Sequence, residues 1–184
     1  MNELGLLAPR VGASERTLRR AVNEGTLRAQ RVSPRRLKLS AAEKEYVLKR
    51  WKLLARLRLT LRTEPGVRFA LLFGSAARGD DTRGSDIDLL VEMRDPSLAR
   101  RADLALKLER LLGRAVEVIA LEEAESNPLL LAAAAREGRV IVDREGRWPS
   151  FNAELERLEQ RADAEYRATK RLALAGIDRL LAER

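Results

Sequence analysis

Residues 74–90, GSAARGDDTRGSDIDLL, combine residue types that act on phosphates and metals. In this segment Gly74-Ser75 is separated by ten residues from Asp86-Ile87-Asp88. On a strand, successive side chains alternate between faces, so the two aspartates would share one face about 6.5–7 Å apart. Two carboxylates on one face repel each other unless a cation lies between them. Mg²⁺ is the expected cation, because it prefers oxygen ligands.

Gly74 and Ser75 are expected to contact phosphates. They follow an apolar run, residues 67–73, and we expect the chain to enter a helical turn after them. Glycine lets a ligand approach the backbone, and the free N–H groups at the start of a helix attract anions. Arg78 can add positive charge for a polyphosphate. The charged residues of the loop that follows are expected to be solvated: Asp80, Asp81 and Arg83.

A phosphate contact and a metal site in one segment predict nucleotidyl transfer. Two metals about 3.5–4 Å apart would activate an acceptor oxygen and stabilise the pyrophosphate that leaves. Such a site usually needs a third carboxylate, and Glu117 in AVEVIAL is our candidate, because a strand beside residues 86–91 could place it over the same metal. Glu122 and Glu123 are the alternatives.

The form LFGSAARGDDTRGSDIDLLVEM resembles the signature of the DNA polymerase β-like nucleotidyltransferase superfamily, particularly its minimal nucleotidyltransferase (MNT) branch. The resemblance covers about residues 66–143. It implies a small mixed sheet flanked by helices, nucleotide phosphates at Gly74 and Ser75, and metal at Asp86 and Asp88. It also implies a third acidic residue on a later strand, where the family usually has Asp and this chain has Glu117.

The elements that would position these residues form an α+β fold. Pro65-Gly66 ends a long helical stretch that a capping-box pattern, Ser40-x-x-Glu43, opens at residue 41. The periodicity after it predicts strands and helices in alternation. The expected strands are 67–73, 86–93, 115–121 and 139–143, and the expected helices are 74–80, 97–112, 127–137 and a long one over 150–184. The last helix has an apolar stripe that needs a partner, in this domain or in another chain.

The first third of the chain carries the basic charge. Residues 1–62 hold 16 Lys and Arg against 5 Asp and Glu, whereas the rest holds 20 against 23. A short helix before Gly12, a second one capped by Ser14, and an alternating stretch with a turn at Ser33-Pro34 predict a winged helix-turn-helix. Such a head would attract a polyanion.

This segment resembles the winged helix-turn-helix heads of MerR- or excisionase-like DNA binders. The resemblance implies that the second helix enters the major groove and that the wing meets phosphates. The candidate DNA-binding residues are Arg16, Thr17, Arg19, Arg20, Arg28, Arg31, Arg35, Arg36 and Lys38. An arginine-rich solvated surface is the alternative, with RNA or an acidic protein as other partners.

The amino-acid composition limits the kinds of catalytic and metal site that the chain can form. The 184 residues include no Cys and no His, which excludes disulfides, thiolate metal sites and imidazole catalysis. No run of about 18–20 apolar residues is present and no leader is recognised, so we expect a cytoplasmic protein. We divide the chain into a winged helix-turn-helix with its linking helix (1–62), a nucleotidyltransferase domain (66–143) and a C-terminal helix (150–184).

Resemblance to MNT proteins implies an antitoxin that moves a nucleotide monophosphate from an NTP, ATP above all, to a hydroxyl of a HEPN-family toxin. The head would bind DNA for autoregulation. Two other functions stay open. One is a transcription regulator whose nucleotidyltransferase domain senses nucleotide or is inactive. The other is a small-molecule, aminoglycoside-type nucleotidyltransferase.

Overall fold

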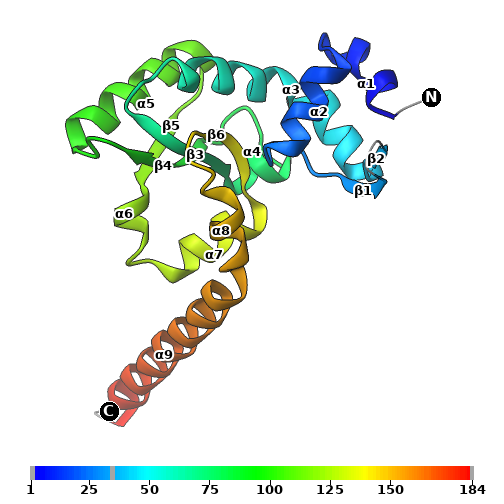
Figure 1. Ribbon diagram of the computed structural model, residues 1–184. Helices are drawn as coiled ribbons and strands as arrows, with labels where there is room; N and C mark the ends of the chain where they lie inside the picture. Colours follow the sequence, from blue (N-terminus) through cyan, green and yellow to red (C-terminus); the bar gives the residue numbers. More distant parts are fainter. Residues whose placement is uncertain (1–2, 34–35, 183–184) are drawn as a thin grey trace.

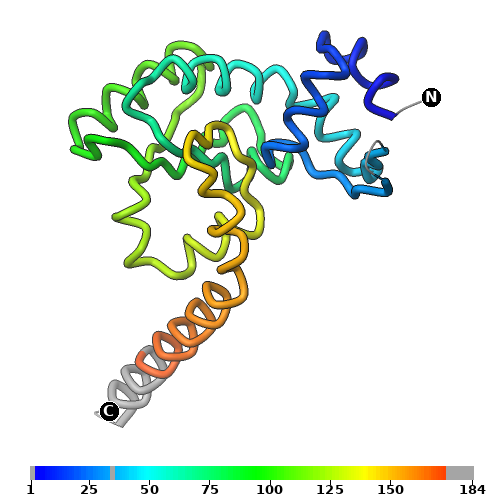
Figure 2. The backbone as a smooth tube through the Cα atoms, in the orientation of Figure 1, coloured from blue at the N-terminus to red at the C-terminus, as the bar shows by residue number. Residues whose placement is uncertain are grey.

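The computed structural model describes residues 3–33 and 36–182, with side chains described up to residue 172. A small head lies at one end of the molecule and a helix-flanked sheet at its centre (Figure 1). Helix α9 (Leu155–Ala182) extends away from the sheet, as the backbone trace in Figure 2 also shows. Within the described residues, no helix combines the length and the apolar character that a membrane crossing requires.

The head contains the helices and hairpin that the sequence predicts. Helix α1 is Glu3–Val11 and helix α2 is Glu15–Asn23, whose cap Ser14 accepts a hydrogen bond from the Thr17 amide. Strands β1 (Gln30–Ser33) and β2 (Arg36–Lys38) pair in antiparallel fashion. The turn residues between the two strands, 34 and 35, lie outside the described residues.

Helix α3 (Ala41–Arg62) joins the head to the sheet. Ser40 caps it by accepting a hydrogen bond from the Glu43 amide, as the capping-box pattern predicts. The carboxylate of Glu43 does not complete the box. It accepts hydrogen bonds from the Arg28 amide and from the guanidinium of Arg139, because Arg139 is buried and needs an ion pair there.

A four-stranded mixed sheet forms the centre in the order β5-β4-β3-β6. Its strands are β3 (Val67–Phe73), β4 (Ile87–Met93), β5 (Val116–Ala120) and β6 (Arg139–Asp143). Strand β3 pairs with β4 and with β6 in antiparallel fashion, and β4 pairs with β5 in parallel. The parallel pair needs a crossover, which α5 (Leu98–Leu112) supplies.

Helices cover both faces of the sheet. One hydrophobic cluster joins the head, α3 and α5 to the face of β4 that carries Ile87 and Leu89. The other joins later helices to the opposite face, through Leu90 and Phe69. The remaining helices are α4 (Gly74–Arg78), α6 (Leu121–Ala124), α7 (Pro128–Glu137) and α8 (Trp148–Ala153).

The single C-terminal helix predicted over 150–184 is wrong, because the chain forms α8 and then α9 with a break at Glu154. Phe151 of α8 and Leu158 of α9 are both buried in the same core cluster.

The apolar stripe of α9 finds a partner over its first part only. Leu158 and Ala162 are buried in the cluster that contains α7 residues, whereas Tyr166 and Leu172 are exposed. The side chains of Ala173, Ile177 and Leu180 lie outside the described ones.

The head packs directly against β6. The hydroxyl of Thr26 donates to the carbonyl of Val140 at 2.6 Å, and the amide of Val140 donates to the carbonyl of Gly25 at 3.2 Å. Arg58 of α3 reaches both the Thr26 hydroxyl and the carboxylate of Glu24. Glu24 also pairs with Arg20 and Arg62, so one carboxylate joins α2 to α3.

Candidate active site

Gly74 and Asp88 bring the two sequence motifs into contact. Strand pairing places Phe73 opposite Asp88, so Gly74 begins α4 beside that aspartate. Gly74 has a φ of +69°, and a Cβ there would lie 2.3 Å from Oδ2 of Asp88. Two features therefore favour glycine at this position: the positive φ of the backbone and the close approach of the Asp88 carboxylate.

Glu117 lies beside Asp88 as the sequence predicts. The parallel register of β4 and β5 pairs Asp88 with Glu117. Asp88 is half-buried, and this burial raises its pKa, followed by the negative charges of Glu117 and Asp86. The three carboxylates thus repel one another at one end of the sheet, where a cation would relieve the repulsion.

The donor set suits Mg²⁺, because all three candidate ligands supply carboxylate oxygen. They are not yet arranged as a metal site: among the residues that the structure describes, no three acidic side chains are gathered closely enough to hold an ion. Asp86 and Glu117 are exposed and lie at strand ends, so their side chains can turn toward a metal.

The alternative carboxylates lie on α6, beyond the end of β5. Glu122 and Glu123 are both exposed, and Glu123 pairs with Arg101 of α5. Their position on a separate helix leaves Glu117 as the acidic side chain in register with Asp88.

Ser75 and Arg78 both lie on α4, directly after Gly74. Arg78 donates through Nε to Asp80 at 3.1 Å and through Nη1 to Glu137 at 2.6 Å. Its guanidinium is partly exposed and close enough to lower the pKa of Asp88. Its contribution to phosphate binding stays a prediction.

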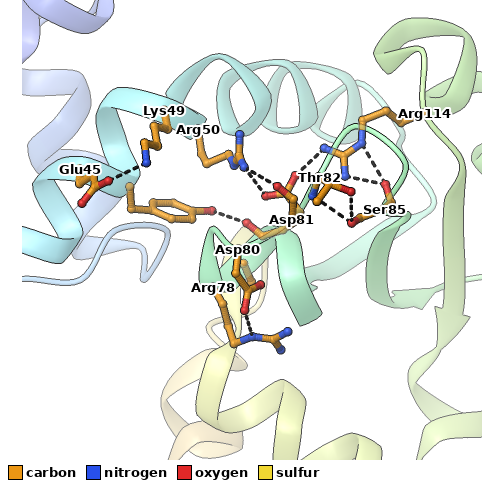
Figure 3. Close-up of polar contacts among 12 residues, drawn as sticks. Glu45, Lys49, Arg50, Arg78, Asp80, Asp81, Thr82, Ser85 and Arg114 are labelled. Carbon is orange, nitrogen blue, oxygen red and sulfur yellow. Dashed lines mark hydrogen bonds and ion pairs between the residues drawn. The ribbon is translucent and has the colours of Figure 1, made fainter.

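The expectation of a solvated Asp81 is wrong. Its side chain is 1% exposed, and it pairs with Arg50 at 2.7 Å and with Arg114 at 2.6 Å. Figure 3 shows the two guanidinium groups on either side of this carboxylate. Asp80 and Arg83 are exposed, as expected, although Asp80 pairs with Arg78. Asp81 thus anchors the loop between the two motifs to α3 and to the chain before β5.

Sequence reasoning missed the residues that hold α4. Tyr46 donates to the carbonyl of Ala76 at 3.1 Å, and burial raises the pKa of Tyr46 to about 12, which keeps its hydroxyl protonated. Nε of Arg139 donates to the carbonyl of Ala77 at 2.7 Å. Tyr46 shares an apolar helical face with ordinary core residues, so only its hydroxyl could have signalled a polar role.

Among the candidate DNA-binding residues that the structure describes, four lie on α2 (Arg16, Thr17, Arg19 and Arg20), three lie on β1 and β2 (Arg31, Arg36 and Lys38), and Arg28 lies between α2 and β1. Arg19 pairs with Glu15, and Arg20 pairs with Glu24. Arg28 instead donates to the carbonyl of Glu137 at the end of α7. The other described candidates have exposed side chains: Arg16, Thr17, Arg31, Arg36 and Lys38. Arg31 donates a hydrogen bond to Asn23. Arg35 lies outside the described residues.

Comparison with known proteins agrees with this geometry. Residues 56–147 match the model of the family described as "Polymerase beta, Nucleotidyltransferase". The protein adenylyltransferase MntA of Thermococcus cleftensis is 42% identical over 60 residues, which are 32% of this chain and 61% of that protein. The chain spans about three-fifths of the length of the curated relatives it matches.

Solved structures share the fold. A chain in the crystal structure of a toxin–antitoxin with AMP-PNP superposes with a TM-score of 0.54 at 24% identity, covering 66% of this chain and 98% of that one. A chain in the complex of the tri-AMPylated Shewanella oneidensis HEPN toxin with its MNT antitoxin gives a TM-score of 0.51 at 22% identity, covering 67% and 98%.

Proposed function

Because the chain belongs to the polymerase β nucleotidyltransferase family, we propose that it transfers an adenylyl group from ATP to a hydroxyl of a protein acceptor. The observation that carries the proposal is the contact between Gly74 and Asp88, with Glu117 in register beside it. It unites a glycine turn suited to phosphates with carboxylates suited to a metal.

Each residue has a role that follows from its place. Gly74 and Ser75 bind the phosphates, and Arg78 orients them when it leaves Asp80 or Glu137. Asp86, Asp88 and Glu117 would hold Mg²⁺. When bound, the metal supplies charge stabilisation for the reacting phosphate.

In the reaction, the acceptor oxygen forms a bond to the α-phosphorus of ATP. The bond from that phosphorus to the bridging oxygen of the β-phosphate breaks, and pyrophosphate leaves. The hydroxyl proton passes to a carboxylate or to water. Asp86 and Glu117 are the exposed carboxylates of the site, whereas Asp88 is half-buried, and we assign this role to Glu117.

The proposed acceptor is a HEPN-family toxin, which would make this chain the antitoxin of the pair. The support is the name of its archaeal relative, a protein adenylyltransferase, and its fold similarity to a chain of the MNT–HEPN complex. The similarity to a chain solved with AMP-PNP supports ATP as the donor. We further propose that the site binds two Mg²⁺ ions.

The decisive experiment incubates the purified chain with Mg²⁺, ATP labelled at the α-phosphate, and the product of the neighbouring gene. We expect label on the partner and its loss in the Asp86→Ala plus Asp88→Ala variant. A charge-matched control, Asp95→Ala plus Asp103→Ala, changes two exposed aspartates elsewhere and should transfer normally. Equal transfer by both variants would refute the site.

We also propose that the head binds the promoter of the pair. Its excess of positive charge and the exposed side chains of Arg36 and Lys38 on β2 support this. In a gel-retardation assay, binding should weaken with salt and with Arg36→Ala plus Lys38→Ala, because phosphate contacts release counterions. Arg56→Ala on α3 is the control.

One observation favours a second candidate, a regulator that binds nucleotide without transferring it. At the position of the third carboxylate this chain has Glu117, where the MNT family usually has Asp. Binding of AMP-PNP without transfer of label to any partner would select this candidate. Label on a small molecule would instead select the aminoglycoside-type activity.

A further inference from the structure

Helix α3 contacts the segment that holds the two motifs at two places, Ala76 and Asp81. Tyr46 and Arg50 are four residues apart and therefore lie on one face of the helix. Tyr46 reaches the carbonyl of Ala76, and Nη2 of Arg50 donates to the carbonyl of Asp81 at 3.0 Å. Both side chains precede residue 56, where the match to the family model begins.

The first contact fixes the end of α4. The last carbonyls of a helix have no partner within it, and α4 has only five residues. The hydroxyl of Tyr46 satisfies Ala76, and Arg139 satisfies Ala77. Gly79, at φ +90°, follows the helix, and a Cβ there would lie 2.8 Å from the Tyr46 ring. The position of Gly74-Ser75 is thus set from the far end of the same short helix.

The second contact fixes the chain on the way to Asp86. Arg50 and Arg114 hold the buried Asp81 between them, and Arg114 also donates to the carbonyl of Ser85 at 2.6 Å. Just beyond Asp86, the amide of Ile87 donates to the carbonyl of Ala115 at 2.9 Å. The backbone is therefore held on each side of the first aspartate, as Figure 3 shows for Arg114 and Ser85.

We propose that Tyr46 and Arg50 are positioning residues for nucleotidyl transfer, with Tyr46 orienting the phosphate-binding turn and Arg50 orienting the metal-binding aspartates. This inference rests on the proposed function. Because α3 also packs in the core of the head, the head becomes a structural part of the catalytic unit.

The test uses the full chain with Tyr46→Phe and Arg50→Met. The chain has two tyrosines, so Tyr166→Phe, at an exposed position, is a matched control. Arg56→Met changes an exposed arginine on the same helix and controls for the second variant. Hydrogen exchange of residues 76–86 reports positioning directly, without any need for turnover.

We expect faster exchange over residues 76–86 in both test variants and in neither control. Binding of AMP-PNP with Mg²⁺, measured by titration calorimetry, should weaken in Tyr46→Phe by up to about fivefold, the limit reached if the whole net energy of the lost hydrogen bond goes into ordering the turn for binding.

With ATP, Tyr46→Phe should mainly raise KM, whereas Arg50→Met should mainly lower kcat. A purely structural loss would lower the active fraction without moving KM. Arg50→Lys should recover part of kcat, since it keeps the charge beside Asp81.

Two results separate the possible failures. Exchange and AMP-PNP affinity that are the same in test variants and controls would overturn the role of α3 and leave the proposed function intact. Wild-type protein that binds no AMP-PNP would overturn the proposed function and, with it, the catalytic role of Tyr46 and Arg50. Since Tyr46→Phe keeps the ring and removes one oxygen, this variant decides the matter even if Arg50→Met does not fold.

Discussion

Gly74 and Asp88 meet where β3 ends and β4 begins, with 2.3 Å between Oδ2 of Asp88 and the place a Cβ would take on Gly74. The phosphate-binding motif at Gly74-Ser75 and the metal-binding motif at Asp86 and Asp88 therefore form a single site. A change in either alters the other, although thirteen residues separate them in sequence.

Replacing Gly74 by Ala should reduce AMP-PNP affinity at least tenfold and lower the free energy of unfolding by about 2 kcal/mol. The causes are a positive φ in a residue with a Cβ and the displacement of Asp88. Calorimetry and urea unfolding measure the two effects. Gly84→Ala is the control, because a Cβ there meets nothing within 4 Å. Similar behaviour of both variants would contradict the contact.

Replacing Glu117 by Gln should lower kcat of adenylyl transfer by about 100-fold or more while AMP-PNP affinity stays within about threefold, since a carboxylate that acts in the transition state is lost. Initial rates with labelled ATP measure this. Glu122→Gln, on α6, should transfer normally. If Glu122→Gln is the damaged variant, the third carboxylate lies on α6 instead.

The neighbours Asp80 and Asp81 should differ sharply in their effect on stability. Asp81→Asn breaks a pair whose carboxylate is 1% exposed, so we expect a loss of about 3–5 kcal/mol in the free energy of unfolding. Asp80→Asn removes a pair whose carboxylate is 62% exposed and should cost about 0–1 kcal/mol. Urea unfolding of the two variants gives the comparison, and equal losses would argue against the buried anchor.

Glu24 should make the packing of α2 on α3 depend on pH. Burial alone would raise its pKa, but hydrogen bonds from Arg20 and Arg58 lower it below the ordinary 4.5. Its pairing therefore stabilises the fold above about pH 4.5 and is lost as the pH falls further. Thermal unfolding should show Glu24→Gln less stable than wild type at pH 7, with the difference shrinking below pH 4.5. A difference that does not change with pH would exclude this origin.

The sequence predicts much of the fold because its signals are local. Ser14 and Ser40 cap the helices that they were expected to cap. The alternation around Ile87 and the apolar run before Gly74 give the two strands that meet at the site. The sequence also places Glu117 on a strand that could lie beside residues 86–91, and the parallel pairing puts it in register with Asp88.

The polar anchors could not be predicted, because each depends on a partner far away in sequence. From its sequence context Asp81 is expected to be a solvated loop residue. In the structure it forms ion pairs with Arg50 and Arg114, which come from other parts of the chain. Glu43 fits the capping-box pattern in the sequence, but in the structure its carboxylate accepts a hydrogen bond from Arg139, 96 residues later. Local sequence patterns predict the secondary structure and the exposure of a residue. Its ion-pair and hydrogen-bond partners depend on which distant residues the fold places beside it.

The contact of Thr26 and Gly25 with Val140 has a consequence for solubility. Strand β6 is the last strand on its side of the sheet, and such a strand can pair with another molecule through its free backbone groups. Here the Gly25 carbonyl accepts from the Val140 amide and the Thr26 hydroxyl donates to the Val140 carbonyl, so the segment after α2 covers that edge at Val140. A chain deprived of its head would expose a bare strand and tend to self-associate.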